Sequence, residues 1–302
     1  MRVEGERMKT KVQKLDIPTK RGTVLDGVLF SAERADTVLI AITGIHGNFY
    51  SNPFYYNIGE TLSVGGMDFI YAQTNDAFGQ IETYNVKTGA KEIIGSWNED
   101  FNYTDEDIEA YLAFAAKASY KHIILAGHSL GANKVIYYLS RHHDSRVEHF
   151  VFLSPANIGY LTSDVTEWEK EVILQQVERG DGNNILPFPL LGWISCIGNT
   201  AYQWVFDNML DNVHVEKDRD FSQVEQITHT GALVIGTYDN FTYGDPSGFL
   251  KNINDHMPTA RENKLIFLER TGHTYQQKEQ ELADKLRELL QGWRQEAARK
   301  AS

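Results

Sequence analysis

One short stretch constrains the fold more than any other part of this 302-residue chain. Ile123-Ile124-Leu125-Ala126 is an apolar run that leads directly into Gly127-His128-Ser129-Leu130-Gly131 and then into a segment with helical periodicity. This order predicts a buried strand, a tight turn that holds one serine, and a helix. The two glycines have a mechanical reason, because the serine backbone in such a turn is strained and side chains at 127 and 131 would clash with the neighbouring chain.

The rest of the chain alternates strands and helices. Lys11–Pro18 and Thr23–Phe30 alternate apolar and polar residues and predict a hairpin. Continuous apolar runs, typical of strands buried on both faces of a parallel sheet, predict further strands at 37–42, 69–72, 147–153, 232–236 and 264–268. Helices are expected at about 52–64 (with Asn52 as cap), 105–119, 130–141, 247–253 and 276–297. We therefore predict an α/β fold with a mostly parallel, doubly wound sheet.

Two segments interrupt this rhythm. Residues 74–102 have no clear period and many polar and turn residues, which predicts a long functional loop. Residues 156–228 contain a helical stretch at 164–178, a turn, a proline-punctuated apolar stretch and an aromatic-rich segment at 201–209. We interpret 156–229 as an inserted cap or lid over a core made of residues 10–155 and 230–298.

Three residues follow separate predicted strands and together predict a catalytic triad. The tight turn Gly127–Gly131 has the pattern of a nucleophile elbow, and Ser129 in it is the predicted nucleophile. Its hydroxyl needs a base to remove its proton. His273 follows the last strand directly, in a glycine-containing loop, and is the predicted base. Asp239 ends the preceding strand and is the predicted acid, which would orient the imidazole. Nucleophile, acid and base thus occur in the chain order that is typical of serine hydrolases whose nucleophile sits in a strand–turn–helix elbow.

Alternatives exist for two of these positions. Among the ten histidines of the chain, only His273 comes directly after the last strand. Asp245 competes with Asp239 as the acid, although its Gly-Asp-Pro context favours a turn or a helix cap. Some hydrolases place the acid after the preceding strand, but Ser154-Pro155-Ala156-Asn157 contains no carboxylate there.

An oxyanion hole needs two donors aimed at the developing negative charge. The backbone N–H of Leu130, directly after the nucleophile, is the first predicted donor. The second is expected from the loop after residues 37–42, where we choose Asn48 and place Gly47 second. The His46 side chain is expected to support this loop rather than carry a proton.

The substrate pocket is expected beneath residues 156–228 and the 74–102 loop. Asn75-Asp76 closes a strand and is expected near its border. No metal or cofactor motif is present in the sequence, and we interpret His142-His143-Asp144 as a solvated helix end. Aromatic residues are candidates to line the pocket: Phe49, Tyr50, Trp97, Phe101, Trp193, Tyr202 and Trp204.

Composition restricts the partners. The formal net charge is −12 and no basic cluster is present, which argues against nucleic acid and anionic membranes. No apolar run approaches a membrane span, and Met1–Lys9 lacks the apolar core of a secretory signal. Cys196 is the only cysteine and is expected to be a small buried side chain. We expect a cytoplasmic protein with a small-molecule substrate, and its oligomeric state is not predicted.

Over about residues 10–298 the chain resembles the α/β-hydrolase superfamily. The matching pieces are His46-Gly47-Asn48, the Gly127–Gly131 elbow, Asp239 and Gly272-His273. The resemblance implies the α/β-hydrolase fold and a serine hydrolase. The 47–50 segment, the long loop and the residues after His273 are more distantly similar to a subgroup with fungal siderophore-ester hydrolases and bacterial relatives. Leu130 departs from the polar residue of that subgroup, so its substrate is not carried over.

These residues predict a serine hydrolase that cleaves a small-molecule carboxylic ester through an acyl-enzyme, without a cofactor. Because one fold hosts many reactions, C–C bond hydrolysis, thioester hydrolysis and acyl transfer with the same triad are alternatives. A third hypothesis is a non-catalytic ligand-binding or sensor protein on the same scaffold, and the complete triad argues against it.

Overall fold

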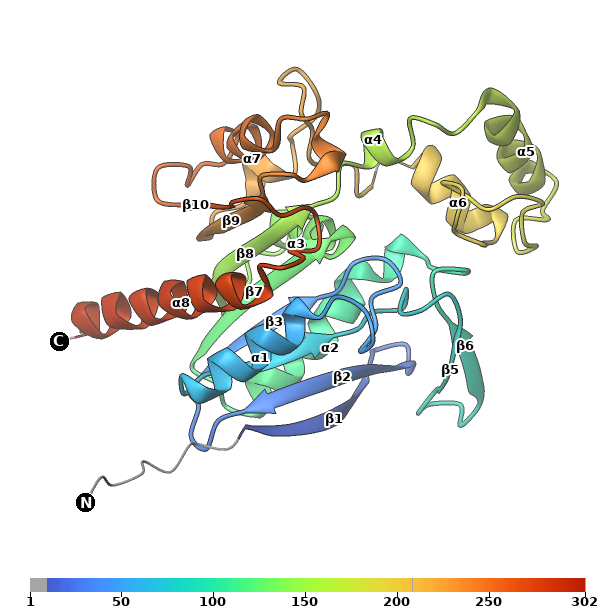
Figure 1. Cartoon of the computed structure of the whole chain (residues 1–302). Helices are drawn as coiled ribbons and strands as arrows, with labels where there is room; N and C mark the ends of the chain where they lie inside the picture. Colours follow the sequence, from blue (N-terminus) through green and yellow to red (C-terminus); the bar gives the residue numbers. More distant parts are fainter. Residues whose placement is uncertain (1–9, 208, 302) are drawn as a thin grey trace.

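The structure is a computed structural model that describes residues 10–207 and 209–301. Residues 1–9, which are not expected to form a secretory signal, lie outside the described residues. One eight-stranded sheet has the order β1-β2-β4-β3-β7-β8-β9-β10 (Figure 1). Its strands are β1 Lys11–Pro18, β2 Val24–Ser31, β3 Thr37–Ile42, β4 Asp68–Ala72, β7 His122–Ser129, β8 Val147–Pro155, β9 Thr230–Gly236 and β10 Lys264–Leu268. The pairs from β4 to β10 are parallel, whereas β2 is antiparallel to both of its neighbours. The predicted mostly parallel sheet is confirmed.

The central strands are apolar because helices cover both faces of the sheet. Every residue of β3 and β4 is buried. One face packs against α1 Phe54–Val64 and α8 Glu279–Ala301, through side chains such as Ile58, Leu62 and Leu286. The other face packs against α2 Thr104–Lys117, α3 Leu130–Arg141 and α7 Pro246–Asp255, through Ile108, Val135 and Phe249. No helix among the described residues is long and apolar enough to cross a membrane.

The segment 74–102 is more ordered than the sequence predicts. It contains an antiparallel hairpin of β5 Ile81–Tyr84 and β6 Lys91–Ile94, followed by the short 3-10 helix η1 Phe101–Tyr103. Each strand has only four residues, which alternate between half-buried and exposed positions. Because that alternation is so short, the sequence pattern does not reveal it.

The cap lies between β8 and β9 and contains α4 Ile158–Leu161, α5 Glu167–Glu178 and α6 Gly198–Val205 (Figure 1). Its apolar side chains, such as Ile173, Ile194 and Cys196, form a cluster that also takes in Leu130 of α3 and Phe101 of η1. The returning chain carries the 3-10 helix η2 Val224–Gln226, whose Val224 packs into the core cluster instead. The inserted helices thus share one apolar cluster with the start of α3, and the last part of the predicted range packs on the main domain.

Three predicted helix starts are wrong. Helix α8 begins at Glu279 rather than at about residue 276. Helix α5 begins at Glu167 rather than at Asp164, because Thr166 forms a capping box with Glu169. Asn52 does not cap α1, since its φ of 55° lies in the left-handed region and Pro53 occupies the capping position without a side-chain hydrogen bond.

Candidate active site

The serine of the elbow stands in a strained conformation between β7 and α3. Ser129 has φ 55° and ψ −129°, a combination that non-glycine residues rarely adopt. A Cβ on Gly127 would lie 2.2 Å from the Gly131 carbonyl oxygen, and one on Gly131 would lie 2.3 Å from the Ile42 carbonyl oxygen. The glycines are therefore required by close backbone approach. The surrounding packing holds Ser129 half-buried at the carboxyl end of β7.

A third glycine borders the serine from the neighbouring strand. Gly44 follows β3, and a Cβ there would lie 2.9 Å from the Ser129 Cβ and 3.0 Å from the His128 carbonyl oxygen. Real side chains essentially never approach so closely. The sequence analysis assigned no role to Gly44, because its requirement arises from the packing of β3 against β7.

His273 and Asp239 meet at the same edge of the sheet. His273 Nδ1 lies 2.9 Å from Asp239 Oδ2, and the Asp239 side chain is only 1 % exposed. The other carboxylate oxygen accepts the Phe241 backbone N–H at 3.1 Å. Burial alone would raise the pKa of Asp239, but the His273 hydrogen bond and charge outweigh it and lower that pKa. Asp239 therefore stays ionised beside the imidazole.

The competing carboxylate has a structural role. Asp245 caps α7, since its side chain accepts the Gly248 backbone N–H at 2.8 Å and Pro246 follows in the first turn. This is the helix cap that its sequence context favours.

A second histidine supports the His273 loop. His128 is buried, and its Nε2 lies 2.9 Å from the His273 carbonyl oxygen. Burial first, and then the charge of His273, lowers the pKa of His128 to about 3. His128 therefore stays neutral and donates this hydrogen bond from Nε2.

One cavity of about 320 Å³ lies beside these residues. It brings together Ser129, His273 and the loop after β3, and two cap residues, Leu161 and Trp193, also line it. Within the described part of the chain, His273 Nε2 has no hydrogen-bond partner. The imidazole of His273, which lines the same cavity as Ser129, therefore has one ring nitrogen available for a hydrogen bond.

Most of the aromatic residues that were predicted to line the pocket lie elsewhere. Trp193 alone among them lines this cavity, whereas Phe101 and Trp204 pack against each other in the cap cluster and Tyr50 is 88 % exposed. No residue of 74–102 lines the cavity either. Asn75 instead lines a different cavity, and Asp76 is buried against Lys134. Aromatic content alone does not tell which rings point inward.

The predicted oxyanion donors differ in their hydrogen bonds. Leu130 is the first residue of α3, where backbone N–H groups have no partner within the helix. The Asn48 N–H donates to Ser51 Oγ at 3.2 Å, and the Gly47 N–H donates to the Gly44 carbonyl at 2.9 Å. The Ile45 N–H finds no acceptor among the described residues, and Ile45 lines the cavity.

Asn133 has a role that the sequence analysis missed. Its Nδ2 donates to the carbonyls of Ala156 at 2.8 Å and Leu210 at 2.9 Å, and its Oδ1 accepts the Ala156 N–H at 2.9 Å. Ala156 and Leu210 stand where the chain enters and leaves the cap. One buried side chain on α3 therefore holds both ends of the cap insertion.

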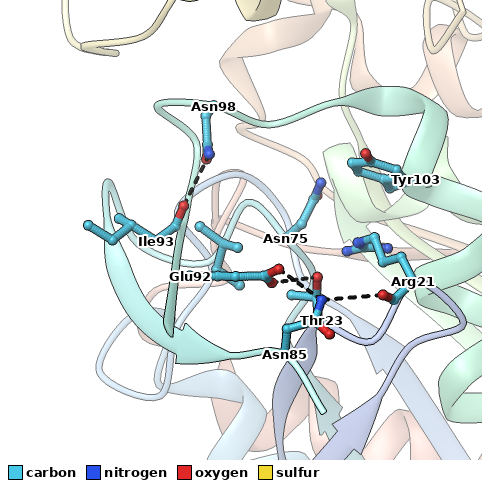
Figure 2. A pocket seen from close by; sticks show the side chains of 9 residues that line it. Arg21, Thr23, Asn75, Asn85, Glu92, Ile93, Asn98 and Tyr103 are labelled. Carbon is cyan, nitrogen blue, oxygen red and sulfur yellow. Dashed lines mark hydrogen bonds between the residues drawn. The ribbon is translucent and has the colours of Figure 1, made fainter. Parts of the chain in front are cut away.

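Another cavity, of about 460 Å³, lies beside the β5–β6 hairpin (Figure 2). At its wall Glu92 accepts hydrogen bonds from Thr23 at 2.7 Å and Asn85 at 2.8 Å, as Figure 2 shows. These contacts tie the hairpin to the turn before β2. Neither Ser129 nor His273 lines this cavity, so the predicted nucleophile and base share only the smaller one. The described residues contain no group of His, Cys, Asp and Glu suited to a metal ion.

No protein-family profile matches the chain, and no curated protein sequence matches it. Solved structures do. DcsB in complex with its substrate analogue has a TM-score of 0.67 and 16% identity over 93% of this chain and 99% of that chain. The α/β hydrolase GrgF from Penicillium sp. sh18 has a TM-score of 0.63 and 16% identity over 91% and 96%. Est1E from Butyrivibrio proteoclasticus, with ferulic acid bound, has a TM-score of 0.60 and 16% identity over 92% of this chain and 98% of that chain. From the strand order and these likenesses, the chain has the α/β-hydrolase fold, with a cap inserted between β8 and β9.

Proposed function

We propose that this protein is a serine hydrolase that cleaves a small-molecule carboxylic ester through an acyl-enzyme. The observation that carries the proposal is the shared position of three groups. Strained Ser129 and His273 line one cavity, and His273 is bonded to buried Asp239. Several solved neighbours are named hydrolases, esterases or lipases, which agrees with this chemistry.

The proposed reaction has two halves. His273 Nε2 takes the proton of Ser129 as its oxygen attacks the acyl carbon, and the same nitrogen then gives the proton to the leaving alcohol. Water, activated by His273, next attacks the acyl-enzyme and releases the acid. Asp239 holds Nδ1 and stabilises the imidazolium in both halves.

We assign the oxyanion donors to the backbone N–H groups of Leu130 and Ile45. Asn48 was the expected partner of Leu130, but its N–H already donates to Ser51. The Ile45 N–H has no such acceptor within the described chain, and Gly44 brings that loop against the serine. Two backbone donors beside the serine, one from the residue after it and one from the neighbouring loop, are what a developing oxyanion requires. The more specific similarity to siderophore-ester hydrolases stays a prediction.

The test replaces the nucleophile. Ser129→Ala should abolish both ester turnover and labelling by a fluorophosphonate probe, while its thermal unfolding stays close to that of the wild type. Ser163→Ala, which changes an exposed cap serine, is the matched control and should keep both activities. Undiminished ester cleavage in Ser129→Ala would overturn the proposal.

A further inference from the structure

Two aromatic rings stand on different sides of the cavity beside Ser129. Phe241 contacts the His273 ring edge-to-face, with centroids 4.5 Å apart. Trp193, from the cap, contacts His46 edge-to-face at 5.1 Å. His46 belongs to the loop after β3 that carries the proposed oxyanion donor Ile45. The cavity therefore has one aromatic wall at the base and another at the oxyanion loop.

The direction of proton transfer distinguishes these walls. His273 must give a proton to the leaving oxygen, so the alcohol part of an ester departs on the His273 side, beside Phe241. The acyl part stays bonded to Ser129 and extends away from the base. Ile45, His46 and Trp193 line the rest of the same cavity, and we place the acyl part against them.

The cavity lining excludes charged acyl groups. No Asp, Glu, Lys or Arg is among the described residues that line it. Burial lowers the pKa of His46, which keeps that ring neutral as well. An ionised acyl group would thus lose its hydration without gaining a partner of opposite charge. The volume of about 320 Å³ lies at the small end for ligand cavities, which favours a compact group over a long chain.

The cap presents Trp193 from a braced turn. Leu190 and Ile194 flank it, are 1 % and 0 % exposed, and exchange backbone hydrogen bonds of 2.8 and 2.9 Å. Gly192, with φ 79°, closes the turn between them. Trp193 itself is 51 % exposed, so its ring stands at the rim with free surface. A large ring held by a rigid turn loses little conformational entropy when it contacts a ligand.

We propose that Trp193 is the specificity-determining wall for the acyl group, and that the preferred substrate is a neutral ester of a compact aryl carboxylic acid. This inference rests on the proposed function. Contacts between aromatic rings stabilise a complex by more than their buried area alone accounts for. An aryl acyl group therefore gains binding free energy from the Trp193 ring that a short linear chain does not gain.

The test compares kcat/KM for 4-nitrophenyl esters of benzoate, butyrate, octanoate and hemisuccinate. We expect benzoate to be preferred and hemisuccinate and octanoate to be poor substrates. Trp193→Ala should lower kcat/KM for the benzoate ester by about tenfold or more, mainly through KM, with a much smaller effect on the butyrate ester. Trp193→Phe should restore most of the preference. Trp168→Ala is the matched control, because Trp168 is an exposed cap tryptophan (60 %) that packs on Phe188 outside the cavity.

A binding measurement keeps this inference separate from the proposed function. Isothermal titration of N-phenylbenzamide, an uncleavable analogue, into Ser129→Ala should show binding that the added Trp193→Ala change weakens and the added Trp168→Ala change does not. Equal binding in all three proteins, no binding in any of them, or an unchanged acyl preference in Trp193→Ala would overturn the inference. If no ester is cleaved in a Ser129-dependent way, the proposed function fails, and the titration still decides the role of Trp193.

Discussion

At the scale of single residues, the candidate site depends on a strained serine and a buried carboxylate. A non-glycine residue at a sparsely populated φ/ψ costs about 1–3 kcal/mol and persists only where its surroundings fix it. For Ser129, the fixing contacts are the glycine backbones at 127 and 131, which leave no room for side chains. Asp239 is fixed by two hydrogen bonds, one from His273 and one from the Phe241 N–H.

The role of Asp239 can be tested against that of its competitor. We expect Asp239→Asn to lower kcat by about 10⁴-fold, because the amide favours the wrong histidine tautomer and cannot stabilise the imidazolium. Asp245→Asn should change kcat little, since asparagine caps helices nearly as well as aspartate. Steady-state kinetics on one ester decides between them, with thermal unfolding as the check on folding. A large loss of kcat in Asp245→Asn alone would transfer the acid role to Asp245.

The proposed triad residues could be named from the sequence because each follows a strand and their order along the chain is informative. The proposed second oxyanion donor could not be named, because that choice depends on which backbone N–H groups of the loop remain unpaired. Asn48 and Ile45 lie three positions apart, and only the folded loop shows that Ser51 accepts the Asn48 N–H. Trp193 could be proposed only as one aromatic residue among several, since a sequence does not show which rings face a cavity.

At the scale of elements, strands buried on both faces were the easiest to predict, and β3 has the predicted bounds. The β5–β6 hairpin was missed because its four-residue strands carry little alternation. The attachment of the cap was also missed. It depends on Asn133 in α3, whose partners Ala156 and Leu210 are distant in sequence.

Asn133→Ala tests this attachment. The change would leave two buried carbonyls and one N–H without these partners. Each buried polar group left unpaired lowers the free energy of unfolding by about 1–3 kcal/mol. We expect a clearly lower free energy of unfolding, measured by urea denaturation, and a raised KM because the cap is held less firmly. Asn102→Ala removes an exposed asparagine and should leave both quantities near wild type. Wild-type stability in Asn133→Ala would show that the cap is held by its other contacts.

At the scale of the whole molecule, a buried ion cluster joins the core to the cap. Lys134 Nζ, on α3, lies 3.0 Å from Asp76 Oδ2 and 2.6 Å from Glu99 Oε1, and both carboxylates are 0 % exposed. Asp76 follows β4, whereas the Glu99 carbonyl accepts a hydrogen bond from Thr200 of α6 at 2.8 Å. One cation thus faces two carboxylates, and a buried excess charge is costly. The contact with Lys134 is the only polar contact of the Glu99 carboxyl group within the described residues.

The charge balance of this cluster predicts how stability depends on pH. Burial is the largest influence on Glu99 and, against the attraction of Lys134, raises the pKa of Glu99 to about 8. The folded protein therefore holds a proton that the unfolded chain releases near the ordinary glutamate pKa. This contribution to stability is complete below that ordinary value and is lost as the pH rises through about 8, with a slope of up to about 1.4 kcal/mol per pH unit.

Glu99→Gln keeps the neutral form and should lose less free energy of unfolding than the wild type over this range, as measured by urea denaturation at several pH values. Glu178→Gln, on the exposed surface of α5, should follow the wild-type curve. Parallel curves for Glu99→Gln and the wild type would mean that Glu99 is already ionised in the folded protein at neutral pH, and that the cluster keeps a net negative charge between core and cap.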